Sequence, residues 1–102
     1  MKKRGWLSQR DYNFIYRKVP RLCIDLVIRE KHGVVLSKRS ITPQKGGWHL
    51  PGGRVRMQES MRDAIRRISR EETGLGVKPQ KILEPIEYRD LGGWGHSVSI
   101  VY

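Results

Sequence analysis

The chain has 102 residues, one cysteine and a formal net charge of +11 at neutral pH, because 21 Lys and Arg stand against 10 Asp and Glu. This length predicts one domain with a modest core, and neither an apolar run of roughly 18 residues nor a signal-peptide core is present to indicate membrane insertion or export. The excess of positive charge favours an anionic partner, such as a phosphorylated small molecule, a nucleic acid or an acidic membrane.

The first predicted elements are a helix and a strand. Ser8 is placed to cap a helix that Pro20 stops. The alternating apolar residues of 21–29 then predict a strand, in which we expect Cys23 to be a buried structural thiol in a reducing, cytoplasmic setting. Asp25 is the unusual member of this strand. Either an arginine pairs with it, or it recognises the base or sugar of a ligand.

A hairpin is predicted next. Gly33 allows the turn, and residues 34–39 form the return strand. Residues 81–88 and 97–102 predict two further strands, the first with Pro85 marking an edge or a bulge. No repeat, low-complexity tract or linker indicates a second domain.

The most informative stretch lies between these strands, over residues 50–75. Gly52 and Gly53 let the backbone turn tightly and approach a ligand, since neither carries a Cβ. A helix is predicted after them, and Gly74 stands where a left-handed cap would end it. The apolar stripe of this helix comprises Met61, Ala64, Ile65 and Ile68.

Carboxylates gather at both ends of that helix. Glu59 precedes it, Glu71 and Glu72 lie in its last turn, and Arg67 shares a face with Glu71. Together with the Gly-Gly turn this arrangement indicates a site for Mg²⁺ or Mn²⁺, which take oxygen ligands and usually bind with substrate phosphates. The plainer alternative is a surface helix with solvated charges.

The spacing of these residues resembles the signature of the Nudix hydrolases. The signature falls on Gly53, Glu59, Arg67, Glu71, Glu72, Gly74 and Leu75. Two positions depart from it: Ile68 stands where the family has a glutamate that binds metal or acts as the base, and Ser69 stands where it has an aliphatic residue. The resemblance implies an α/β fold, the Nudix α/β/α sandwich with a mixed sheet. We expect one domain over 1–102, truncated at its C-terminal end, with the Nudix loop–helix motif at 50–75.

The missing glutamate points to one branch of that family. Residues 19–26, 37–39 with 47–48, and 50–55 resemble the GDP-mannose mannosyl hydrolases, which also lack it. The resemblance covers roughly residues 8–76. It implies Mg²⁺- or Mn²⁺-dependent hydrolysis of a nucleoside-diphosphate sugar, of the GDP-mannose or GDP-glucose type, to a nucleoside diphosphate and the sugar. It also implies a homodimer to which the N-terminal helix contributes.

The same resemblance assigns roles to residues. The implied metal ligands are the Gly52 carbonyl, Glu72 and Glu71. The implied catalytic residues, which would stabilise charge on the leaving group, are Arg39, Arg54 and Arg67. The implied substrate-binding residues are Asp25, Arg39 and Arg54. Glu59 is expected to pair with Arg67 and brace the loop. No general base is assigned, because the branch carries it on a histidine in a later region that we expect to be absent here.

Two alternatives remain open. One is ordinary pyrophosphate cleavage of a nucleotide, and the other is a non-catalytic module that binds nucleotides or RNA. Nucleic acid is the disfavoured partner, because the basic residues are spread along the chain and do not interleave with aromatic side chains as a single-strand platform requires.

Overall fold

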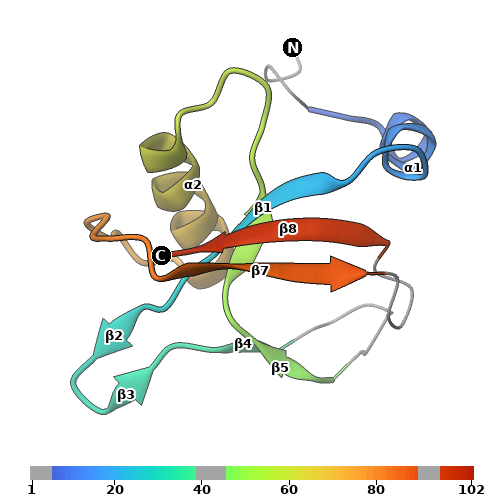
Figure 1. The fold of residues 1–102 in the computed structure, drawn as a ribbon. Helices are drawn as coiled ribbons and strands as arrows, with labels where there is room; N and C mark the ends of the chain where they lie inside the picture. The colour runs from blue at the N-terminus through green and yellow to red at the C-terminus, as the bar shows by residue number, and fades with distance from the viewer. Residues whose placement is uncertain (1–5, 39–45, 90–94) are drawn as a thin grey trace.

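The computed structural model describes residues 6–38, 46–89 and 95–102. No helix in these ranges is long and apolar enough to cross a membrane. The elements are shown in Figure 1. In chain order they are α1 (Gln9–Tyr16), β1 (Arg21–Asp25), β2 (Arg29–Glu30), β3 (Gly33–Val34), β4 (Ser37–Lys38), β5 (Trp48–His49), β6 (Gly52–Arg54), α2 (Met61–Thr73), β7 (Glu84–Arg89) and β8 (His96–Val101).

The central element is a four-stranded sheet in the order β6-β1-β8-β7. β1 runs parallel to β8 and antiparallel to β6, and β7 runs antiparallel to β8, so the sheet is mixed, as predicted. Pro85 lies in β7, which is an edge strand, and this confirms the predicted edge position. β2 and β3 form the predicted hairpin, while β4 and β5 pair separately.

The strand predicted over residues 21–29 is divided in the structure. β1 ends at Asp25, and the N–H groups of Leu26 and Val27 donate to the carbonyls of Pro51 and Tyr102 at 2.8 and 2.7 Å. Pairing resumes at β2 within the hairpin. The apolar alternation continues through the break, so the sequence pattern alone did not reveal it. The return strand predicted over 34–39 is likewise split between β3 and β4, and its last residue lies outside the described ranges.

Helix α2 forms as predicted, and its ends show why. The Ser60 hydroxyl accepts a hydrogen bond from the Asp63 N–H at 3.0 Å, and Gly74 ends the helix with φ of 74°. Ser69, which stands where an aliphatic residue was expected, is buried, and its hydroxyl donates to the Leu75 carbonyl at 2.9 Å. This hydroxyl therefore fastens the chain that leaves the helix.

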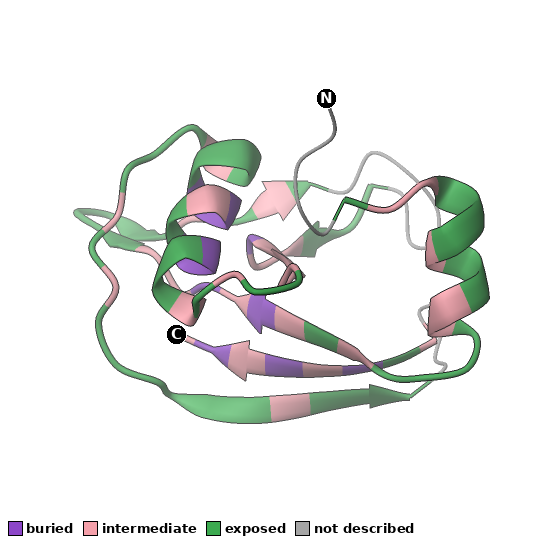
Figure 2. Cartoon of the chain, turned by 90° about the horizontal axis from the view of Figure 1, so that it is seen from above, coloured by how far each residue is buried: buried purple, intermediate pink, exposed green. Residues whose placement is uncertain are grey.

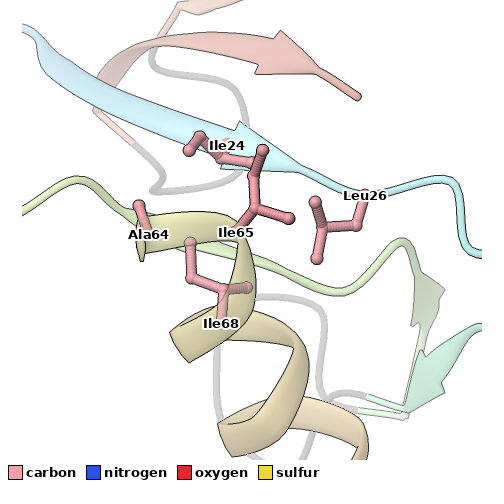
Figure 3. Close-up of a cluster of buried hydrophobic side chains, with 5 residues drawn as sticks. All are labelled: Ile24, Leu26, Ala64, Ile65 and Ile68. Atoms are coloured by element: carbon pink, nitrogen blue, oxygen red, sulfur yellow. The ribbon is translucent and has the colours of Figure 1, made fainter. Parts of the chain in front are cut away.

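The hydrophobic core lies between α2 and one face of the sheet (Figure 3). It comprises Ile24, Leu26, Ala64, Ile65 and Ile68. A Cβ added at Gly53 would lie 3.3 Å from Cγ1 of Ile68, so the glycine lets the helix approach β6 closely. The register places Ile24 opposite Gly53, whereas Cys23 and Asp25 point to the other face of the sheet.

Helix α1 contacts side chains of that other face. Ser8 caps it as predicted, accepting from the Asp11 N–H at 3.1 Å, but the helix ends at Tyr16, earlier than Pro20. None of its eight residues is buried, whereas α2 carries a buried side (Figure 2). The two helices therefore differ in structural role: α2 covers the hydrophobic core, and α1 lies outside that core.

Candidate active site

The side chain of Arg67 ties the segment after β6 to α2. Its guanidinium forks onto Glu59, with Nε 2.7 Å from Oε2 and Nη2 2.9 Å from Oε1. Nη2 also donates to the Arg54 carbonyl at 2.8 Å, and Nη1 donates to Glu71 at 3.2 Å. Four of its five N–H groups therefore donate to oxygens of the described chain. We call Glu59, Arg67 and Glu71 the Arg67 corner.

The carboxylate of Glu59 is stabilised at this corner. Its side chain is 14% exposed and that of Arg67 is 17% exposed, so little water screens the pair. The hydrogen bond from Arg67, with a second from the Arg56 N–H at 3.1 Å, holds the pKa of Glu59 below its usual range. Glu59 in turn raises the pKa of Arg67. The predicted ion pair is confirmed, and it fixes the backbone that follows the two glycines.

The predicted metal ligands lie at the end of α2 and in the edge strand. Glu71 contacts Arg67 and also lies 3.7 Å from Nη2 of Arg56, while Glu72 is exposed in the last turn. Among the described residues, no three His, Cys, Asp or Glu side chains are grouped so as to hold a metal ion. With Gly52 in β6, the predicted set offers two carboxylates and one main-chain carbonyl.

The departure from the Nudix signature has a structural counterpart. Ile68 is 1% exposed and packs in the core cluster against Gly53. A carboxylate at this position would have to point elsewhere or lose its water. In this chain the position of the missing glutamate belongs to the core.

A second polar group of residues lies on the opposite face of the sheet. Ser99 donates its hydroxyl hydrogen to Oδ2 of Asp25 at 2.7 Å. Burial raises the pKa of Asp25, and this hydrogen bond, with the nearby His49 and Tyr88, offsets only part of the rise. The structural alternative for Asp25 was an arginine partner. Among the residues that the structure describes, Ser99 takes that place. We call Asp25, Ser99 and Gly52 the Asp25 corner.

Gly52 is required for the position of Asp25. The register sets the two residues opposite each other in β6 and β1. A Cβ added at Gly52 would overlap Oδ1 of Asp25 and would lie 2.8 Å from the Ile24 carbonyl oxygen. The glycine thus leaves space for a carboxylate beside the edge strand, which is a role that the motif spacing did not indicate.

Arg54 points to the same face, next to α1. Its guanidinium carbon lies 6.0 Å from the ring centre of Tyr16, and Nη1 is 3.4 Å from the Val55 carbonyl. Arg21 donates to Ser97 at 2.9 Å and to the Tyr12 hydroxyl at 3.0 Å. The aromatic side of α1 therefore lies against two arginines.

The remaining predicted residues are less informative. Cys23 is half-buried, and burial raises the pKa of its thiol although Arg21 opposes the rise. Arg39 lies outside the described residues. The sequence pattern did not identify Ser99 as a site residue. The signal was the polar alternation of Ser97 and Ser99 in a strand, but only the pairing of β8 with β1 brings it to Asp25.

Comparison with known proteins identifies the domain. A model of the NUDIX domain matches residues 19–102. The chain belongs to the Nudix family. The mixed sheet flanked by helices is thus the Nudix fold, as predicted.

Two curated relatives match at similar levels. The low-salt glycan biosynthesis protein Agl8 of Haloferax volcanii is 37% identical over 78 residues, which cover 76% of this chain and 50% of that protein. An ADP-ribose pyrophosphatase of Methanocaldococcus jannaschii is 36% identical over 83 residues, covering 81% of this chain and 49% of that protein. This Nudix chain therefore spans about half the length of these relatives.

Solved structures agree on the fold. The MutT NUDIX hydrolase of Burkholderia pseudomallei superposes with a TM-score of 0.75 at 30% identity, over 83% of this chain and 66% of that one. The NUDIX domain of Shewanella oneidensis NrtR, solved with ADP ribose, gives a TM-score of 0.71 at 25% identity, over 94% and 69% of the two chains. These relatives include hydrolases and a domain that binds a nucleotide sugar.

Proposed function

We propose that this Nudix domain hydrolyses a nucleoside-diphosphate sugar of the GDP-mannose or GDP-glucose type, releasing the nucleoside diphosphate and the free sugar. The observation that carries the proposal is Ile68, a core residue at the position where the family has a metal-binding or basic glutamate. Attack of water at the anomeric carbon makes the nucleoside diphosphate the leaving group. That reaction depends on stabilising charge on the diphosphate more than on a metal-bound hydroxide. The likeness to a glycan biosynthesis protein supports a sugar substrate.

The arginines have separate roles in this proposal. Arg54, at the end of β6, binds the diphosphate together with Arg39 and stabilises the charge that grows on it, since guanidinium groups match phosphate oxygens. Arg67 has one N–H beyond the four used at its corner. It therefore acts mainly by holding the Arg54 backbone, with at most one hydrogen bond to the leaving group.

Asp25 contributes to recognition rather than to bond breaking. Its carboxylate lies beside Gly52 with one oxygen bonded to Ser99, on the face of the sheet that also presents Arg54. We propose that it accepts hydrogen bonds from the base or sugar. A partly buried carboxylate gains most from a ligand donor, because water satisfies it poorly.

We propose that a divalent cation binds at this site. The Gly52 carbonyl, Glu72 and Glu71 would hold Mg²⁺ or Mn²⁺, which commonly take one or two carboxylates together with substrate phosphates. When bound, the ion supplies neutralisation of the diphosphate charge. Glu71 would share its carboxylate between the ion and the arginines that it contacts. We also propose that the chain acts as a homodimer, with the exposed side of α1, including Phe14 at 58% exposure, in the contact.

A second candidate is pyrophosphate cleavage of ADP-ribose. It is favoured by the relative named as an ADP-ribose pyrophosphatase and by the NrtR domain solved with ADP ribose. The two reactions give different products. Cleavage at carbon leaves a nucleoside diphosphate and a sugar, whereas cleavage at phosphorus leaves a nucleoside monophosphate and a sugar phosphate.

Phosphorus NMR of the products tests both candidates. With GDP-mannose and Mg²⁺ we expect GDP as the phosphorus-containing product, and Glu72→Gln should abolish its release. Glu84→Gln removes another exposed carboxylate far along the chain, in β7, and should leave turnover unchanged. Failure to release GDP at micromolar enzyme would reject the first candidate. Release of AMP and ribose phosphate from ADP-ribose would establish the second.

A further inference from the structure

Three arginines form a row along the solvent side of α2. Arg62, Arg66 and Arg70 are spaced four residues apart and are all exposed. This spacing sets consecutive members about 6 Å apart along the helix axis and on one side of it. The opposite side of α2 carries the buried residues that face the sheet (Figure 2). We call these three residues the arginine row.

The side chains of the row make no polar contact that holds the fold together in the described part of the chain. None of its members forms an ion pair or side-chain hydrogen bond with another residue in the parts of the chain that the structure describes. Arg67, on the same helix, instead donates hydrogen bonds from four N–H groups to protein oxygens. Like charges one helical turn apart destabilise a helix by about 0.2–0.5 kcal/mol per pair. Arg70, in the last turn of α2, is favoured by the helix dipole, but Arg62 and Arg66 have no such compensation.

We propose that the arginine row binds the sugar–phosphate backbone of a nucleic acid without reading its bases. Guanidinium groups match phosphate oxygens in pairs, and three of them span about 12 Å of the helix. The net charge of +11 would attract a polyanion to the molecule before docking.

A nucleic acid suits this surface better than an acidic membrane does. The exposed side of α2 presents no apolar side chain that could enter a bilayer, and the charged Asp63 lies beside the row. From the sequence, nucleic acid was disfavoured because the basic residues are dispersed. The helix brings three of them onto one surface, away from the Asp25 corner on the other face of the sheet. The proposal is independent of the hydrolase reaction.

The test measures binding of a labelled, single-stranded 20-nucleotide RNA by fluorescence anisotropy at several salt concentrations. The variant is Arg62→Gln, Arg66→Gln and Arg70→Gln combined. Its control is Arg29→Gln, Lys31→Gln and Lys78→Gln combined, which removes three other exposed charges elsewhere. Both changes take the net charge from +11 to +8, since each removes three cations. Glutamine retains good helix propensity, and circular dichroism with urea unfolding verifies that both variants fold.

The expected result is specific to the row. Each lost phosphate contact lowers the slope of log K against log salt by about 0.7 for a single strand, so the row variant should lose about 2 from the slope and roughly a hundredfold in affinity near 0.1 M salt. The control should lose less than about threefold, because charges more than about 10 Å from the RNA are screened at that salt.

Three outcomes would overturn the proposal. They are unchanged RNA binding by the row variant, an equal loss in the control, and row-dependent binding to vesicles of phosphatidylserine and phosphatidylcholine with none to RNA. The second outcome would show that net charge acts, and the third would show that the partner is a membrane. Because neither variant alters the residues assigned to hydrolysis, loss of RNA binding with normal turnover separates the two proposals.

Discussion

The Arg67 corner and the Asp25 corner each contain a partly buried carboxylate, and they shift the pKa of that carboxylate in opposite directions. At the first, a forked arginine and a backbone N–H lower the pKa of Glu59. At the second, burial raises the pKa of Asp25, and hydrogen bonds from Ser99 and Tyr88 offset only part of the rise. The two groups have similar chemistry but different surroundings.

This difference separates a carboxylate that stabilises the fold, Glu59, from one that is able to bind a ligand, Asp25. A carboxylate that is matched by a bidentate cation is satisfied within the protein, and losing either partner leaves the other charge poorly solvated. A carboxylate held mainly by a hydroxyl retains capacity to accept further hydrogen bonds. We therefore expect damage at the Arg67 corner to appear chiefly as lost stability, and damage at the Asp25 corner to reach substrate binding as well.

The largest effect is expected from Gly52→Ala. The new methyl group would overlap Oδ1 of Asp25 and lie 2.8 Å from the Ile24 carbonyl, and that backbone oxygen cannot move without breaking the β1–β6 register. Overpacking of this kind costs about 2–3 kcal/mol, which urea unfolding would measure.

Gly76→Ala provides the matched control for this change. A Cβ at Gly76 meets no atom within 4 Å and its backbone has an ordinary φ, so the stability should change by no more than about 0.5 kcal/mol. Equal losses for the two variants would mean that Gly52 is not shaped around Asp25.

The next effect is expected from Arg67→Ala. Glu59 would lose its fork and the Arg54 carbonyl would lose a donor, at a cost of about 2 kcal/mol near pH 7. Because the folded protein lowers the pKa of Glu59, the stabilisation is complete above the unfolded-state pKa and is lost as pH falls through the folded one.

Urea unfolding at pH 7 and at about pH 3 therefore checks the sign of this linkage. The stability difference between the unmodified chain and Arg67→Ala should shrink at the lower pH. Glu59→Gln should cost little when added to Arg67→Ala, since the pair is already broken. If the stability difference between the two proteins stayed constant with pH, the ionised Glu59 would not be the partner through which Arg67 stabilises the fold.

The buried side of α2 could be predicted from the sequence, because its apolar residues recur with the period of a helix. Gly74 at the end of α2, and Ile65 and Ile68 in its stripe, lie as the pattern predicted. The same local logic located the Glu59–Arg67 pair, since both residues belong to one loop–helix motif. The signature spacing led to the correct family.

The Asp25 corner could not be predicted because it depends on pairing between distant segments. Asp25 and Ser99 are 74 residues apart in the chain and meet only through the parallel β1–β8 pair. Periodicity shows which residues of a strand share a face, but it does not reveal which strand lies alongside. The metal ligands and the roles of Arg39, Arg54 and Arg67 remain predictions. They depend on how a bound substrate and metal ion would contact these side chains.

The smallest effect is expected from Ser99→Ala, and it tests the distinction between the corners directly. Ser99 is 1% exposed, so water cannot easily replace its hydroxyl, and losing a hydrogen bond to a carboxylate should cost about 1–2 kcal/mol. The same change in an Asp25→Asn background should cost less, because a neutral amide gains less from the donor. If Asp25 recognises substrate, Ser99→Ala should also raise KM several-fold with little change in kcat, since the bond orients the carboxylate rather than the leaving group. A fall in kcat at unchanged KM would place Asp25 in the chemical step, and unchanged kinetics with lost stability would make this corner a second brace.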